Sequence, residues 1–243
     1  MFYISFYGLC GSNINSRNLG IYQQLIFADG TILYPQKLIN MKYLSKELLD
    51  GLYAQTESQL TTLISQWQQL PAEFFTAQPG PGKWSAVQCL EHLNSYGRFY
   101  LPAMEKAIVK EEKQFYYTHF KSGLLGNYFY RLMLPGLDGK PKKKMKSPKD
   151  HRPAEQLNTA QVLSEFIGQL EKLEQLITLS QKRDLNRIKV PISIAPFIKL
   201  KLGDVLLFYT AHIQRHLLQA ERAMKTAGYQ SIPVKENTRE VRA

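Results

Sequence analysis

Residues 203–226, GDVLLFYTAHIQRHLLQAERAMKT, are the stretch that decides the fold. Their apolar side chains recur at helical spacing, which predicts an amphipathic helix from about Val205 to Thr226. We expect Asp204 to cap the start of this helix. Gly228 is expected to end it, because glycine favours the left-handed turn that follows many helices.

The same helix carries two histidines four residues apart, His212 and His216. Four residues of helix rise about 6 Å and turn slightly more than once, so both imidazoles project from one face. Val205 and Ala220 share that face, which must therefore point into the protein, where each imidazole needs partners for both nitrogens. Taken alone, this spacing favours a hydrogen-bonded pair of core histidines, with a metal site as the alternative.

A third histidine lies in residues 83–94, KWSAVQCLEHLN. Ser85 and Gln88 have the spacing of a capping box, which predicts a helix start, and Pro102 is expected to kink the helix further on. His92 falls on its second turn. Three histidines divided between two facing helices give the ligand count of a catalytic zinc-type site, whose fourth position stays open to water or substrate.

Two further helices complete a bundle. One is predicted in residues 41–70 and the other from about Ala154 to Lys182, each with an apolar stripe. In the first, the inward residues are expected to be Leu44, Leu48, Leu52, Leu60, Leu63, Ile64 and Trp67. The connection from Lys110 to Pro153 is too long for a simple helical hairpin and includes an aromatic-rich segment, expected to form a short helix. The sequence therefore predicts an all-α four-helix bundle with a long crossover between helices 2 and 3.

KWSAVQCLEHLN and GDVLLFYTAHIQRHLLQ resemble two segments of the DinB/YfiT-like superfamily, over roughly residues 41–228. The first is similar to the Trp-Ser cap and histidine that open the family's second helix. The second is similar to its fourth helix, with a His-x-x-x-His pair. The resemblance implies an up-down-down-up bundle in which His92, His212 and His216 hold one divalent metal ion, whether zinc, nickel, iron or manganese. The lysine-rich connection at residues 138–152 departs from the family's simple link.

The resemblance also implies an activity. Relatives include thiol-dependent S-transferases, a thiol-dependent isomerase and metal-dependent hydrolases, so we expect a metal-dependent transferase or hydrolase acting on small molecules, in detoxification or stress response. Tyr96 and Tyr209, each one turn from a ligand, are candidates to hydrogen-bond the bound water or substrate, and core packing is the alternative for both. Glu91 points about 100° away from His92 around the helix, so it is not expected to be the general base. The rival function is a non-catalytic metal-binding or stress-induced bundle protein.

Charge and composition narrow the list of partners. The net charge is +11, and two stretches hold most of it: residues 138–152 have seven basic and two acidic residues, and residues 182–201 have six and one. Both are predicted to be connections between helices, without the interleaved aromatics of a single-strand binding surface, so nucleic acid is not expected to be the partner. We expect a small-molecule substrate, such as a low-molecular-weight thiol, and a homodimer. No segment has the roughly 20 apolar residues of a membrane span, so no membrane partner is expected.

The remaining histidines and the two cysteines are not expected to be ligands. His119 and His151 both fall in the crossover and are predicted to be exposed. Cys89 is a possible extra ligand, but a small buried helix residue is the preferred interpretation. Cys10 and Cys89 form too small a set to imply a disulfide framework, and the first sixteen residues have no basic n-region, so we expect a cytoplasmic protein.

The chain is expected to divide into three parts. Residues 1–40 lack helical periodicity and are predicted to be an extension outside the core fold, with a small hairpin around Asp29-Gly30. Residues 41–230 are the predicted bundle, and 231–243 a tail. Because a methionine stands at the boundary, Met41 is a possible start of the working protein, and the extension is expected to be dispensable.

Overall fold

The structure is a computed structural model, and it describes residues 25–26, 32–33, 41–111, 118–136 and 145–230. The chain divides into two compact units, Met1–Leu38 and Ile39–Ala243. In the first, β1 (Leu25–Ile26) pairs antiparallel with β2 (Ile32–Leu33), so the predicted hairpin is present, although its turn lies outside the described residues.

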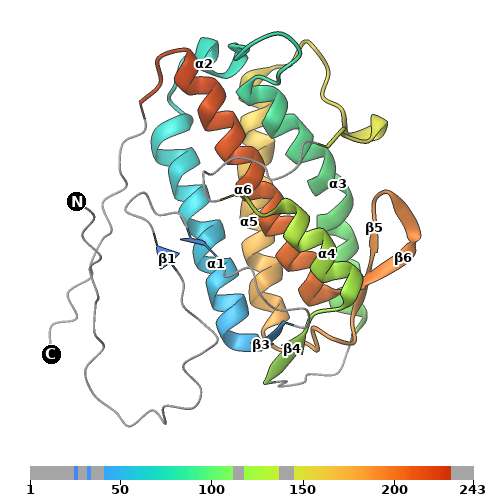
Figure 1. Cartoon of the computed structure of the whole chain (residues 1–243). Coiled ribbons are helices and arrows are strands. Elements are labelled where there is room, and N and C mark those ends of the chain that lie inside the picture. Colours follow the sequence, from blue (N-terminus) through green and yellow to red (C-terminus); the bar gives the residue numbers. More distant parts are fainter. Residues whose placement is uncertain (1–24, 27–31, 34–40, 112–117, 137–144, 231–243) are drawn as a thin grey trace, which may run out of the picture. The chain divides into compact units, whose positions relative to one another are not determined.

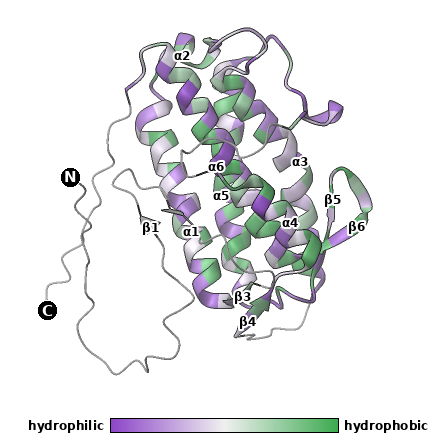
Figure 2. Ribbon diagram, viewed as in Figure 1, coloured by the Kyte–Doolittle hydropathy of each residue, from purple (hydrophilic) through white to green (hydrophobic). Residues whose placement is uncertain are grey.

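Four long helices build the second unit (Figure 1): α1 (Ser45–Thr62), α3 (Ala86–Lys110), α5 (Thr159–Ser180) and α6 (Leu202–Thr226). Helix α3 packs against α5 and α6, and α1 packs against α5. Apolar residues alternate with hydrophilic ones around each helix (Figure 2). The fully buried side chains come from all four helices and include Leu49, Leu90, Leu93, Met104, Phe166, Leu170, Leu173 and Tyr209. The predicted helical class of fold is therefore confirmed, with small hairpins added to it.

The first helix begins later than the sequence predicted. Lys42–Leu44 form a short strand, β3, which pairs antiparallel with β4 (His119–Lys121). Tyr43 points inward and stacks on Phe120, with ring centroids 6.0 Å apart, whereas Leu44 is 38% exposed. The assignment of Leu44 to the helical stripe was wrong because a strand turns alternate side chains to opposite faces.

Helix α1 ends in a π-helical turn, Leu63–Trp67, followed by the short helix α2 (Ala72–Thr76). Trp67 is buried as predicted, but Ile64 is 44% exposed, which corrects its place on the inner face. The wider turn changes the angle between successive residues, so the 3.6-residue spacing no longer holds there. Helix α3 then starts at the predicted capping box, in which the Ser85 N–H donates to Gln88 Oε1 at 3.1 Å. It continues past Pro102 to Lys110 without a break.

The long connection between α3 and α5 forms local structure of its own. Its aromatic-rich segment contains α4 (Leu124–Met133), which confirms the expected short helix and packs against α6. A single 3-10 turn, η2 (Lys149–His151), follows close to α3. Helix α5 begins at Thr159 rather than Ala154, because the Asn158 side chain caps it by accepting from the Gln161 N–H.

Asp204 does not cap α6, whose N-cap is Lys201. The Asp204 carboxylate is buried and instead accepts hydrogen bonds from Ser122 Oγ, at 2.5 Å, and from the Gly123 N–H. Gly123 is the N-cap of α4, so Asp204 satisfies the start of a neighbouring helix. At the other end, Gly228 takes a φ of +91°, the left-handed conformation predicted there.

Between α5 and α6 the chain forms a β-hairpin rather than a plain connection. Strand β5 (Lys189–Ile192) pairs antiparallel with β6 (Ala195–Lys201), with an irregularity in register between Pro191 and Ile192. Val190 and Leu200 are buried on its inner side, so the basic stretch at residues 182–201 is partly a sheet surface. Among the described helices, none is long and apolar enough to cross a membrane.

Candidate metal centre

Three histidines from two helices meet inside the bundle. His92 comes from α3, and His212 and His216 come from successive turns of α6. All three are buried, with exposures of 3, 4 and 8%, and their ligand atoms lie within 4.8 Å of one another. The structure thus brings together the three residues predicted to be ligands. Four-helix bundles build metal sites from inward side chains in this way.

Two of the imidazoles have their tautomers fixed by their neighbours. His92 Nδ1 lies 2.7 Å from the carbonyl oxygen of His151, and because a carbonyl only accepts, Nδ1 carries the proton. His216 Nδ1 lies 3.1 Å from Gln219 Oε1, an acceptor of the same kind. In neutral rings so protonated, Nε2 has an unshared electron pair. Such a hydrogen bond on the far nitrogen is the usual support for a metal-ligating histidine.

The spacing of the nitrogens fits one small divalent ion. Zinc-to-nitrogen bonds of about 2.0 to 2.1 Å at tetrahedral angles place two ligand nitrogens about 3.3 Å apart. The Nε2 atoms of His92 and His212 are 3.3 Å apart. Since His92 and His216 carry their protons on Nδ1, their Nε2 atoms are both acceptors. Without a cation, the only proton that a neutral triad can offer them is one on His212 Nε2. The residues present therefore fit a metal ion as the shared partner.

The surroundings keep these histidines neutral. Burial lowers the pKa of His92 to about 4, although the hydrogen bond to the His151 carbonyl opposes the shift. Burial also holds the pKa values of His212 and His216 well below the ordinary value, and the neighbouring histidines and Arg215 lower them further. Neutral imidazole is the form that binds a metal, so the site is prepared for ligation at neutral pH.

Sequence reasoning missed His151. It was predicted to be exposed, but it is half-buried beside the site, with its ring stacked on Tyr96 at a centroid distance of 3.9 Å. Ser95 Oγ lies 2.9 Å from His151 Nδ1 and fixes the ring further. Since η2 reaches His92 across 59 residues of chain through a backbone carbonyl, no side-chain pattern in the sequence could have indicated this contact.

Trp84 and Tyr96 form the aromatic surroundings of the triad. The Trp84 ring lies 4.9 Å from that of His92, and the Tyr96 ring lies 4.5 Å from that of His212. Burial raises the pKa of Tyr96 to about 12, so its hydroxyl stays protonated at neutral pH. The Tyr96 ring therefore lies beside two of the triad histidines.

The other sequence candidates lie elsewhere. Tyr209 is buried against Tyr100, with ring centroids 5.8 Å apart, which agrees with its core-packing alternative. Glu91 forms an ion pair with Arg98 at 2.8 Å, away from the triad, as expected. Cys89 is fully buried, and burial raises the pKa of its thiol to about 12, which disfavours the thiolate form a metal needs. His119 is exposed, as predicted.

Arg215 is a second residue that sequence reasoning did not select. It is 7% exposed, and its Nη1 donates to the Leu132 carbonyl at 3.2 Å. Its charge lowers the pKa of all three histidines. A fixed positive charge near the site favours an anion, such as a thiolate or hydroxide, over a neutral ligand.

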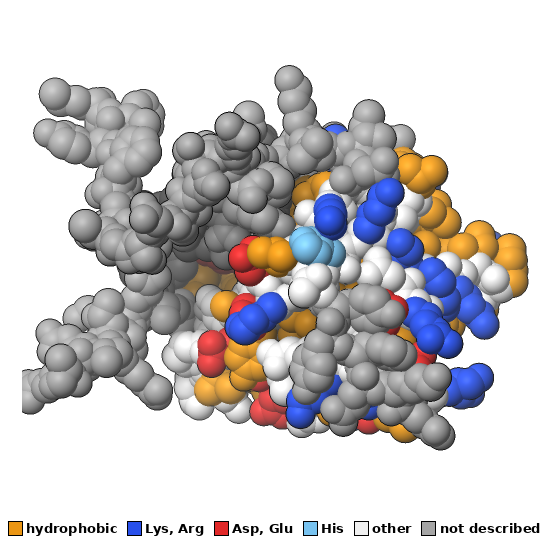
Figure 3. Space-filling view, turned by 90° about the horizontal axis from the view of Figure 1, so that it is seen from below, with side chains coloured by type: hydrophobic (Ala, Val, Ile, Leu, Met, Phe, Trp, Pro, Cys, Tyr) orange, Lys and Arg blue, Asp and Glu red, His pale blue; other side chains and the backbone are white. Residues whose placement is uncertain are grey.

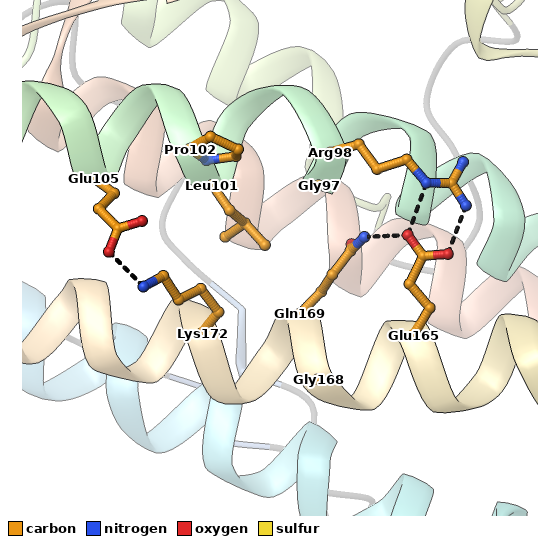
Figure 4. Close-up of a pocket in the computed structure, with 9 residues that line it drawn as sticks. All are labelled: Gly97, Arg98, Leu101, Pro102, Glu105, Glu165, Gly168, Gln169 and Lys172. Carbon is orange, nitrogen blue, oxygen red and sulfur yellow. Dashed lines mark hydrogen bonds and ion pairs between the residues drawn. The ribbon is translucent and has the colours of Figure 1, made fainter.

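A surface hollow of about 280 Å³ lies between α3 and α5 (Figure 4), outside the triad. The charged side chains along it are already paired, Arg98 with Glu165 at 2.6 Å and Lys172 with Glu105 at 2.5 Å. Its walls include Gly97 and Gly168, which have no side chains to fill the space. The hollow is therefore not a candidate active site.

Comparison with known proteins supplies the family. The model of the DinB superfamily matches residues 54–220, which is more than half of the chain and includes all three histidines. The protein belongs to the DinB superfamily, as the two histidine segments predicted. No curated protein and no solved structure matches the chain.

Proposed function

We propose that this protein is a metal-dependent enzyme of small-molecule chemistry, either a thiol S-transferase or a hydrolase, acting in detoxification or stress response. One observation carries the proposal: three buried, neutral imidazoles converge, and the nitrogens facing away from the centre in His92 and His216 are already hydrogen-bonded. Without a cation, a single proton on His212 Nε2 can serve only one of the other two Nε2 atoms at a time, so a buried acceptor is left without a donor, which is unfavourable.

In this proposal His92, His212 and His216 hold one divalent ion, whether zinc, nickel, iron or manganese. A bound ion of this kind lowers the pKa of a coordinated water or thiol. The His151 carbonyl keeps His92 in the tautomer that offers Nε2. Tyr96, with its pKa raised to about 12, donates a hydrogen bond to a substrate oxygen or sulfur without losing its proton. Arg215 stabilises negative charge in the site.

The rival function is a metal-binding bundle without catalysis, and a turnover experiment separates the two. Purified protein is mixed with monochlorobimane and a low-molecular-weight thiol, bacillithiol or glutathione, and conjugate formation is followed by fluorescence. A second assay offers ester and amide substrates for hydrolysis.

The expected result is turnover by the unaltered chain and loss of turnover in His212→Ala, with no loss in the matched control His119→Ala, which removes an exposed histidine outside the triad. Metal bound at the triad with no turnover in either assay would support the non-catalytic rival.

Three further expectations belong to this proposal. The helices run up-down-down-up, so that the long connection between α3 and α5 is a crossover between parallel neighbours. The protein forms a homodimer, and it works in the cytoplasm on a small-molecule substrate.

A further inference from the structure

Residues 147–152, which we call the strap, form a short segment beside α3 (the yellow turn in Figure 1). The strap has hydrogen bonds of its own: the His151 N–H donates to the Pro148 carbonyl at 3.1 Å, and Arg152 Nε donates to the Ser147 carbonyl at 3.2 Å. Within the strap, only Ser147 and His151 are partly buried, and the other side chains are exposed. The strap therefore holds a shape of its own and is anchored by His151.

The anchor lies on the part of α3 that carries the ligand His92. The carbonyl oxygen of His151 accepts from His92 Nδ1 at 2.7 Å and from Ser147 Oγ at 3.3 Å, so both of its lone pairs are in use. The ring of the same residue stacks on that of Tyr96, with centroids 3.9 Å apart. Both the backbone and the side chain of His151 thus contact the surroundings of the triad.

Ser95 fixes the direction of the His151 ring. The Ser95 hydroxyl donates to the His92 carbonyl at 2.8 Å, and Nδ1 of His151 lies 2.9 Å from the same hydroxyl oxygen. Because a hydroxyl has one proton, His151 Nδ1 is the donor in the second contact. One hydroxyl therefore connects the backbone of the ligand His92 to the ring that anchors the strap.

The strap and a metal ion would use opposite nitrogens of one imidazole. The orientation that brings Nε2 of His92 into the triad is also the one that carries Nδ1 to the His151 carbonyl. Whichever contact forms first bears the loss of rotamer freedom of the ring, so the other contact then forms more easily. Such a coupling between two binding events acts equally in both directions.

We propose, on the basis of the metal site in the proposed function, that His151 is a positioning residue for His92 and that docking of the strap and binding of the metal ion strengthen each other. Metal-loaded protein keeps the strap docked, and metal-free protein releases it more often. Loss of the groups that orient a histidine ligand typically lowers metal affinity by about 10- to 100-fold. Since the carbonyl remains when the His151 side chain is removed, the lower end of this range is expected.

The effect of the metal on the strap is measured by hydrogen–deuterium exchange and mass spectrometry of the full chain, either chelator-treated or loaded with zinc. The amides of His151 and Arg152, both hydrogen-bonded inside the strap, should exchange about 10-fold more slowly with zinc, because the coupling is reciprocal. The amides of the β3–β4 strand pair are the internal control and should exchange equally in both samples. In His151→Ala, zinc should slow the exchange of the strap much less.

The effect of the strap on the metal is measured as the zinc dissociation constant, by competition with a chelating dye. His151→Ala and Ser95→Ala should each bind zinc about 10-fold more weakly. Ser95→Thr keeps the hydroxyl and should bind zinc as the unaltered chain does, which separates the hydrogen bond from a general loss of packing. The control His119→Ala removes an exposed histidine from β4, at the end of the molecule that Figure 3 views, and should also leave the affinity unchanged.

Two failures are distinguishable. If zinc binds at the triad, as its loss in His212→Ala would show, but the strap exchanges equally with and without zinc, the coupling is overturned and the metal site stands. An unchanged dissociation constant in both His151→Ala and Ser95→Ala would overturn it in the same way. A full chain that binds no zinc would overturn the coupling together with the metal site of the proposed function.

Discussion

The two ring nitrogens of His92 make different contacts. Nδ1 donates to a carbonyl from η2, and Nε2 faces His212 at 3.3 Å. The first contact fixes the ring and its tautomer, and the second places Nε2 among the three nitrogens that could bind one metal ion. The i, i+4 spacing on α6 and the capped start of α3 indicated the three histidines as candidates, and the resemblance to the DinB/YfiT-like superfamily was needed to predict that they form one metal triad. The contact of His151 was not predictable, because it is made by a backbone carbonyl from a distant segment. The effect of Arg215 on the histidine pKa values was not predictable either, because it depends on the distances between charges in the folded protein.

The lowered pKa of His92 makes a prediction about acid. Burial lowers its folded-state pKa from 6.5 to about 4, so the unfolded chain binds more protons than the folded one between these values. The contribution to stability is complete above pH 6.5 and is lost as the pH falls toward 4, by about 2 kcal/mol at pH 5. Urea unfolding of chelator-treated protein at pH 7 and pH 5 measures this loss.

The variant His92→Gln is the control for other titrating groups. The unaltered protein should lose about 2 kcal/mol more stability between the two pH values than this variant does. His212 and His216 shift in the same direction and increase the loss in both proteins. Equal losses would show that His92 is not held neutral by burial.

Among the elements, the long helices were the most predictable and the strands the least. Apolar residues that recur at helical spacing over about twenty residues predict a helix well, as α3, α5 and α6 show. Strand β3 has three residues, and its partner lies more than seventy residues away, so no local pattern specifies it. The helix α4 was expected from its composition. The hydrogen bond from the start of α4 to Asp204 was not expected, because the Asp204 carboxylate was predicted to cap its own helix, α6.

The junction between α4 and α6 depends on a glycine. A Cβ atom at Gly126 would overlap the Asp204 side chain, whereas one at Gly168 on α5 meets no atom within 4 Å. Gly126→Ala is therefore expected to destabilise the protein by about 1 to 3 kcal/mol. Gly168→Ala, the matched control, should stabilise it by about 0.5 to 1 kcal/mol, because alanine is the better helix residue. Denaturant unfolding measures both, and a neutral Gly126→Ala would contradict the close approach.

For the whole molecule, the division at Leu38 and Ile39 separates the extension from the bundle. The bundle requires its own first strand, since Met41 accepts a backbone hydrogen bond from Ser122 and Tyr43 stacks on Phe120. In residues 1–40 the described part is the two-stranded hairpin of β1 and β2, and a hairpin of this kind is at best marginally stable alone.

A chain beginning at Met41 should therefore melt at the temperature of the full chain and bind the same amount of metal. A chain beginning at Ser45 is the control and should melt earlier, because it lacks β3. Thermal unfolding compares the three. An early melt or aggregation of the Met41 chain would show that the extension belongs to the fold.

The proposed function depends on His92, His212 and His216 together holding one divalent ion. The most direct measurement is elemental analysis of protein purified without chelator or metal-affinity resin, for the full chain and for His92→Ala, His212→Ala, His216→Ala and the control His119→Ala. We expect one metal ion per chain in the unaltered protein and in His119→Ala, and almost none in the three triad variants, each still helical by circular dichroism. A full chain without metal, or a triad variant that keeps one ion per chain, would contradict it.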